Sequence, residues 1–240
     1  MNFTGKLFLA GLIALLAVAA TASVSAASEA IAAKLSAESQ QDLKRIETFL
    51  NGMKTLRAGF LQVSSNGAVA TGKLIMSRPG KMRFEYDPPA PIMMIADGVF
   101  LIYIDKELEQ VTHLWLSNTP IGFLVEEDIK LTGDVTVTKF EKGPNILRAT
   151  LARTKEPEQG TITMIFSDQP LALRKWVITD PQGIRTTVTL SNLEDGIKID
   201  PKLLVCPRIN SANNPQSLPR YAKSAYHLCV IRVEYNIKYD

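Results

Sequence analysis

The sequence predicts a mainly β protein with helices: an incomplete antiparallel β-barrel covered by an N-terminal helix and a short helical lid. Three observations favour this fold class. A long amphipathic segment lies near the N-terminus, a series of short segments with alternating apolar and polar residues follows it, and one segment with helical spacing interrupts that series. Strands in hairpin order without intervening helices indicate an antiparallel sheet, and a large sheet of this kind curls.

The N-terminal residues are typical of a secretory signal peptide. Lys6 precedes an apolar run at 7–20, and small residues follow at 21–27. The run is shorter than the roughly 20 residues of a membrane-spanning helix, and the sequence near Ala26 contains no cysteine that could carry a lipid anchor. We therefore expect a signal peptide at 1–26, with cleavage after Ala26 or Ala27, and a mature protein that is soluble in the periplasm.

A single amphipathic helix is expected at 28–53. Ile31, Leu35, Leu43, Ile46, Leu50 and Met53 recur at intervals that place them on one face. Asn51 and Gly52 supply a plausible stop, since both residues tolerate the left-handed conformation at a helix C-terminus.

From residue 56 onward the period changes to two. The clearest strand is 81–87, in which Met82, Phe84 and Tyr86 point one way and the charged residues between them point the other. Such a strand belongs to an antiparallel sheet with one solvent-exposed face. The other expected strands are 56–64, 69–77, 92–96, 99–104, 110–116, 134–141, 146–153, 161–167, 171–179 and 185–193.

The interruption at 118–128 predicts a short helix between strands. Thr119 suits an N-cap and Pro120 suits the first helical turn. Ile121, Leu124 and Val125 then share one face. A helix at the rim of a curled sheet is a natural lid.

Composition and motifs exclude several functions. The net charge is only +3, and the basic residues are interleaved with acids, which does not favour nucleic-acid binding. The chain has only two histidines, His113 and His227, which does not favour a histidine-based catalytic triad or a metal site. The acidic groups at 107–109 and 126–128 lie at turns or helix ends, where solvated acids are routine. We therefore expect no enzymatic activity and no cofactor.

The C-terminal residues differ from the rest. The regular pattern stops after Val205, so we expect one domain at 28–205 and an atypical tail at 206–240. Cys206 and Cys229 could form a disulfide in an oxidising compartment, although sequence alone does not show that their geometry allows it.

The strand faces carry an excess of soft, bulky side chains. Methionine suits surfaces that accept variable apolar ligands, yet such residues are also ordinary core residues, and composition leaves both interpretations open. The candidate residues for an apolar cavity are Met82, Phe84, Tyr86, Met94, Tyr103, Trp115, Ile121, Leu124, Met164, Phe166 and Trp176.

A resemblance to a known family adds to this pattern. The run at 72–86, with Arg78-Pro79-Gly80-Lys81 before an aromatic strand, resembles the core motif of the LolA family of outer-membrane lipoprotein carriers. The order of features agrees as well: segment 60–62 follows the first helix, segments 95–98 and 101–103 follow the motif, and 118–120 opens the interrupting helix. The resemblance covers roughly 43–204. It departs at Met82, where the family often has phenylalanine, and after Val205, where an aromatic-rich ending is usual.

The resemblance implies a helical lid over an apolar cavity. It also implies a monomeric carrier that takes lipoprotein acyl chains from an inner-membrane ABC lipoprotein-release complex to an outer-membrane acceptor. Arg78 matches an arginine that bonds to the lid in the closed state, and Asn118, Thr119 and Pro120 match the start of that lid. We expect Arg78 to latch the empty protein by donating hydrogen bonds to carbonyls near Asn118–Pro120. The alternative is a non-transporting periplasmic domain that senses lipid or regulates a partner.

Overall fold

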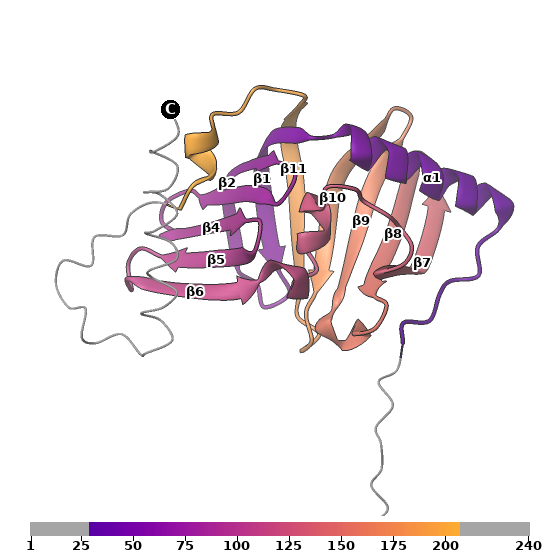
Figure 1. Ribbon diagram of the computed structural model, residues 1–240, viewed down its shortest axis with the longest axis horizontal. Coiled ribbons are helices and arrows are strands. Elements are labelled where there is room, and N and C mark those ends of the chain that lie inside the picture. The colour runs from indigo at the N-terminus through magenta and orange to yellow at the C-terminus, as the bar shows by residue number, and fades with distance from the viewer. Residues whose placement is uncertain (1–28, 207–240) are drawn as a thin grey trace, which may run out of the picture.

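The computed structural model describes residues 29–206, which form one open, strongly curved sheet with a helix and a lid on its concave side (Figure 1). The expected signal peptide, Cys229 and most of the expected tail lie outside the described residues. Within residues 29–206, no helix is both long and apolar enough to cross a bilayer.

The described residues form a sheet of 11 antiparallel strands in the order β6-β5-β4-β3-β2-β1-β11-β10-β9-β8-β7. Its two edge strands, β6 and β7, do not pair with each other, so the predicted barrel is incomplete. In Figure 1, β4–β6 run across the view while β7–β10 run up and down it, which reflects the twist of a large sheet. The strands are β1 Thr55–Ser64, β2 Val69–Ser77, β3 Lys81–Tyr86, β4 Ile92–Asp97, β5 Phe100–Asp105, β6 Gln110–Trp115, β7 Val135–Gly143, β8 Ile146–Arg153, β9 Thr161–Asp168, β10 Leu171–Thr179 and β11 Arg185–Asp195.

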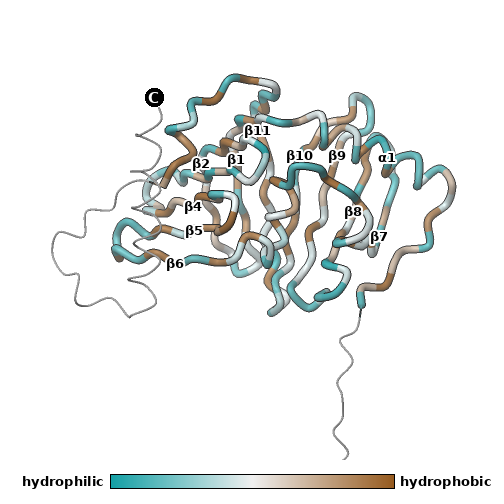
Figure 2. Tube along the Cα trace, viewed as in Figure 1, coloured by the Kyte–Doolittle hydropathy of each residue, from teal (hydrophilic) through white to brown (hydrophobic). Residues whose placement is uncertain are grey.

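The sheet has one strongly apolar face, as the alternating sequence pattern predicts. In β3, Met82, Phe84 and Tyr86 are buried while the residues between them are half-buried. Figure 2 shows hydrophilic residues gathering in turns such as the one between β5 and β6. The concave face therefore holds the main core.

The N-terminal helix is shorter than predicted. Helix α1 spans Ala37–Gly52, and the Ser36 side chain caps it by accepting a hydrogen bond from the backbone N–H of Ser39. The preceding residues run beside the β7–β8 hairpin, where Ala33 N donates to the Val137 carbonyl of edge strand β7 and Ala30 N donates to the Thr154 carbonyl just after β8. These bonds occupy backbone groups at the end of the sheet, which explains why helical periodicity in 29–36 does not produce a helix.

The connection between the two edge strands crosses the concave side and forms the lid, residues 116–134. The expected helix at 118–128 is instead two short 3₁₀ helices, η1 Leu116–Asn118 and η2 Gly122–Val125. Thr119 is the C-cap of η1 rather than the predicted N-cap, and its Oγ1 donates to the Leu116 carbonyl and accepts from Gly122 N, which joins the two turns.

The convex face carries a smaller apolar cluster at the β4–β5 end of the sheet. Met93, Ile95, Ile102 and Ile104 pack there with Cys206, which is disulfide-bonded. The short helix η4, Pro201–Leu204, also lies on this side, where Arg83 donates to the Leu203 carbonyl.

Candidate functional site: a latched lid over an apolar sheet face

Aromatic side chains form the centre of the concave face. The Phe60 ring lies edge-on to Phe84 and Tyr86, with centroids 5.4 and 5.1 Å away, and Phe84 lies edge-on to Trp176 at 6.4 Å. Gly72 is required beneath this group, because a Cβ there would lie 2.6 Å from the Phe60 ring. The result is a dry, aromatic floor that spans strands from β1 to β3 and β10.

Most of the predicted cavity residues belong to this face. The buried ones pack in one cluster: Met82, Phe84, Tyr86, Ile121, Leu124, Met164, Phe166 and Trp176. Met94 is half-buried against the same cluster, and Tyr103 pairs with Met94 across β4 and β5, which places both on the concave side.

The prediction for Trp115 is wrong. Trp115 pairs with Phe100, whose ring packs with the convex cluster, and the two ring centroids are 4.6 Å apart. Because side chains alternate along a strand, Phe100 lies on the opposite face from Leu101 and Tyr103. Trp115 therefore faces away from the concave side and is 58% exposed.

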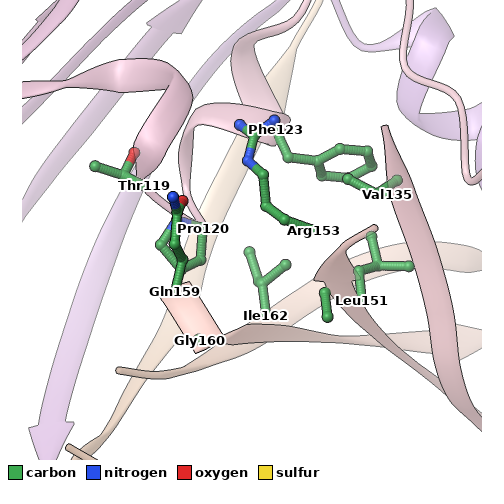
Figure 3. Close-up of a pocket in the computed structure, with 10 residues that line it drawn as sticks. Thr119, Pro120, Phe123, Val135, Leu151, Arg153, Gln159, Gly160 and Ile162 are labelled. Atoms are coloured by element: carbon green, nitrogen blue, oxygen red, sulfur yellow. The ribbon is translucent and has the colours of Figure 1, made fainter. Parts of the chain in front are cut away.

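Lid side chains fill the space above the floor. Ile121, Phe123, Leu124 and Val125 are all buried in the concave cluster, as is Ile129 further along the lid. A cavity beneath the start of the lid, between Pro120 and β8–β9, has a volume of only about 20 Å³ (Figure 3). That is room for about one water molecule, so the space directly beneath the start of the lid holds no long ligand while the lid is closed. Two larger hollows of about 540 Å³ each adjoin the lid: one lies beside Leu116 and Glu126, and the other lies between α1, Leu131 and β7.

Arg78 holds the far end of the lid. Its guanidinium is buried and donates to the carbonyls of Glu126 at 2.7 Å and Glu127 at 3.1 Å. It also donates to the carbonyls of Leu50 and Met53 at the end of α1. The last carbonyls of a helix have no partner within it and carry partial negative charge, so Arg78 caps α1 and fastens the lid to it at once.

The position of this latch differs from the prediction. Arg78 was expected to bond near Asn118–Pro120, where the lid begins, but its lid partners lie at Glu126 and Glu127, where the lid ends. Asn118 is exposed, and the hydroxyl of Thr119 bonds within the lid. Pro120 lines the small cavity beside Gln159.

Further hydrogen bonds gather at the same end of the lid. The Asn51 amide donates to the Ile129 carbonyl at 2.8 Å and accepts from Ile129 N at 2.9 Å, while its oxygen also accepts from Arg78. Leu131 N donates to the Glu47 carboxylate, and Gly80 N donates to the Val125 carbonyl. The lid is thus held at 125–131 by polar bonds and at 121–125 by apolar contacts.

The helix that receives the lid is itself anchored. Lys142 on β7 contacts Glu38 and Asp42 of α1 at 2.8 and 2.9 Å, and Arg45 bridges Asp42 to Asp168. Ile46 and Leu50 are fully buried beneath the helix. These ion pairs and buried contacts fix α1 to the sheet.

Burial sets the ionisation of the polar groups in the site. It lowers the pKa of Arg78, yet a guanidinium remains charged throughout the physiological range. It raises the pKa of Tyr86 to about 12, and the Tyr86 hydroxyl donates to Gln62 at 2.7 Å. The latch therefore carries a permanent cation, and Tyr86 stays neutral on the apolar floor at physiological pH.

Sequence reasoning missed several residues of the site. Asn51 matched the pattern of a helix stop, and nothing in the sequence indicates that its side chain joins Arg78 to the lid. In the sequence, Glu47 resembles an ordinary solvent-exposed acidic residue of a helix. Phe60 was visible only as part of the family resemblance, although its place in an alternating strand was a usable signal.

A family model described as outer membrane lipoprotein carrier protein LolA matches residues 51–205. The fold and the site together define an open antiparallel sheet whose apolar face is closed by a separately held lid. The chain belongs to the LolA family.

Several known proteins are similar to this chain. An outer-membrane lipoprotein carrier protein of Legionella pneumophila is 29% identical over 173 residues, which cover 69% of this chain and 85% of the relative. An uncharacterized protein of Rickettsia prowazekii is 27% identical over 151 residues, 63% of this chain and 70% of the relative. The crystal structure of a LolA superfamily protein from Nitrosomonas europaea aligns with a TM-score of 0.39 at 11% identity, covering 68% and 96% of the two chains.

Proposed function

We propose that this protein is a periplasmic carrier that binds the acyl chains of lipoproteins and shields them from water. The observation that carries the proposal is an apolar sheet face closed by an apolar lid that a buried arginine fastens through backbone carbonyls. Family membership supports binding rather than catalysis, and the relatives named as lipoprotein carriers supply the ligand class.

The energetics of such a carrier follow from what the lid covers. Each buried methylene gains about 0.8 kcal/mol, so one long acyl chain gains on the order of 10 kcal/mol in a dry site. A carrier that only gained this energy would never release its cargo. In this protein, closing of the lid on release offsets part of the lost burial free energy. Lid side chains such as Phe123 and Leu124 return to the concave face, and the Arg78 hydrogen bonds re-form.

The transport cycle that we propose has two membrane partners. An inner-membrane ABC release complex loads the open protein, and an outer-membrane acceptor receives the acyl chains as the lid closes. The protein acts as a monomer in this cycle and, after removal of the signal peptide at 1–26, its domain works in the periplasm.

The test is release of lipoproteins from spheroplasts. Purified mature protein is incubated with spheroplasts, and lipoproteins are measured in the soluble fraction. We expect the wild-type protein to make them soluble, and we expect Phe84→Asp to fail, because a carboxylate in the aromatic floor opposes acyl-chain burial. Absence of soluble lipoproteins with the wild-type protein would contradict the proposal.

The matched control is Thr189→Asp. Thr189 is exposed on the convex side of β11 beside Lys175, so an added carboxylate there leaves the concave face intact. Circular dichroism checks that each variant folds. If Phe84→Asp does not fold, Met94→Asp places the charge at a half-buried position on the same face and takes its place.

A further inference from the structure

One polar atom in the concave core has no partner. The indole Nε1 of Trp176 is buried and finds no hydrogen-bond acceptor anywhere in residues 29–206. The Trp176 side chain is 1% exposed, which makes it one of the largest fully buried residues of the described chain. An indole N–H can only donate, so in the closed protein this group lacks the bond that it had with water.

The surroundings of Trp176 explain why it stays unpaired. Its neighbours across β9 and β11 are Met164 and Val188, and the nearest aromatic contact is the perpendicular ring of Phe84. The Gln62 oxygen on the same face is already bonded to the Tyr86 hydroxyl at 2.7 Å. The floor around Trp176 thus offers apolar surface and no free acceptor.

A buried donor without an acceptor destabilises a fold, and tryptophan and tyrosine normally find a partner when buried. Phenylalanine would fill much of the same space without this cost. The site therefore holds a donor that no group in residues 29–206 satisfies, and a bound acceptor would satisfy it. An acyl chain carries a suitable acceptor, because its ester or amide linkage places a carbonyl oxygen at the end of the hydrocarbon.

We propose that the Trp176 indole N–H donates a hydrogen bond to the ester or amide carbonyl of a bound acyl chain and so selects acyl over alkyl chains. This inference rests on the proposed function and identifies the chemical group that the concave face recognises. It also sets the position of the ligand on the floor: the carbonyl lies at Trp176, and the hydrocarbon lies along the apolar side chains around it.

The experiment compares two synthetic probes. One is a cysteine peptide whose glyceryl group carries palmitoyl ester chains, and the other is the same peptide with hexadecyl ether chains, which lack the carbonyls. Affinities are measured for the wild-type protein, Trp176→Phe and Trp115→Phe. Trp115 is the matched control, since it is exposed on the other face and the chain contains only these two tryptophans.

We expect the wild-type protein and Trp115→Phe to prefer the ester probe roughly tenfold, the size of one buried hydrogen bond. Trp176→Phe should bind both probes equally. Equal affinity of the wild-type protein for both probes would overturn the inference while leaving the carrier function intact. Failure to bind either probe would instead contradict the proposed function and the inference with it.

A second measurement does not depend on the variant folding. The two indole N–H signals are recorded by NMR on the wild-type protein and assigned with Trp115→Phe. The Trp176 signal should move downfield with the ester probe and not with the ether probe, while the Trp115 signal stays in place. An equal shift with both probes would show that the carbonyl does not reach Trp176.

Discussion

Arg78 is a buried cation held by oxygens that carry no full charge. Four of its five hydrogen bonds end on backbone carbonyls and one on the Asn51 amide oxygen. A planar, multiply donating guanidinium suits this arrangement, whereas a lysine ammonium could satisfy only part of it. Because the acceptors come from both α1 and the lid, this single side chain stabilises the closed state, and it loses the Glu126 and Glu127 carbonyls when the lid opens.

Replacing Arg78 by leucine should therefore bias the protein toward the open state. The variant should fold, bind acyl chains roughly tenfold or more tightly, and release them more slowly, because the closed state that competes with ligand is weakened. Affinity for a palmitoylated peptide and transfer to acceptor vesicles measure the two effects.

The control is Arg83→Leu, on the convex side of the next strand, where Arg83 bonds to Glu85 and to the Leu203 carbonyl. It should leave both quantities near the wild-type values. Wild-type affinity and release in Arg78→Leu would show that Arg78 is no latch.

At the scale of elements, the lid is a sequence of tight turns rather than a helix. Gly122 makes the turn between η1 and η2 possible, because a Cβ there would lie 2.2 Å from the Leu116 carbonyl oxygen. The apolar residues that follow are then aimed at the floor. Thr119 was predicted as an N-cap, but it follows η1 as its C-cap, and η2 begins after Ile121. The length of these elements depends on the Gly122–Leu116 contact, which involves residues six apart and which periodicity does not reveal.

Gly122→Ala should disrupt the closed lid without unfolding the sheet. We expect a lower free energy of unfolding, by about 1–3 kcal/mol as for other overpacked sites, together with faster proteolysis within 116–131 and tighter acyl binding. Thermal unfolding and limited proteolysis measure the first two effects.

Gly52→Ala serves as the comparison, since a Cβ at the end of α1 meets no atom within 4 Å and alanine favours a helix. It should be neutral or slightly stabilising. A compact, protease-resistant lid in Gly122→Ala would contradict the role given to this glycine.

At the scale of the whole molecule, the lid lies between the sheet and α1, and the proposed function requires it to move while they stay in place. The sheet is continuous through the β1–β11 pairing, and α1 is tied to it by buried apolar residues and by Lys142 and Arg45. The lid is attached covalently to both edge strands, and its ends bond to the sheet through Leu116, Gly133 and Asp134. Between these ends it is held by side-chain packing and by the bonds at 125–131. Ligand binding should therefore loosen the lid while it stabilises the rest.

Amide hydrogen exchange measures this opposite response. On loading with a palmitoylated peptide, the amides of Ile129, Leu131 and Gly80 should exchange faster, because their acceptors at Asn51, Glu47 and Val125 are lost when the lid moves. Amides in the β1–β11 ladder should exchange at an equal or slower rate. Slower exchange throughout the lid on loading would show that ligand binds without displacing it.

The sequence determined much of this protein by itself. Alternation of apolar and polar residues predicted each strand to within a few residues, since burial on one face of a sheet imposes a period of two. The same alternation identified Met82, Phe84 and Tyr86 as one apolar group, and the family motif singled out Arg78.

Only the tertiary structure decided how these parts meet. Residues 29–36 lack a helix because the edge of the sheet uses their backbone, and Trp115 faces outward because its strand takes its register from Phe100. Arg78 reaches the end of the lid rather than its start because α1 brings its own free carbonyls, and Asn51, to that end. Each of these outcomes depends on atoms that are distant in the chain, and local periodicity contains no information about such contacts.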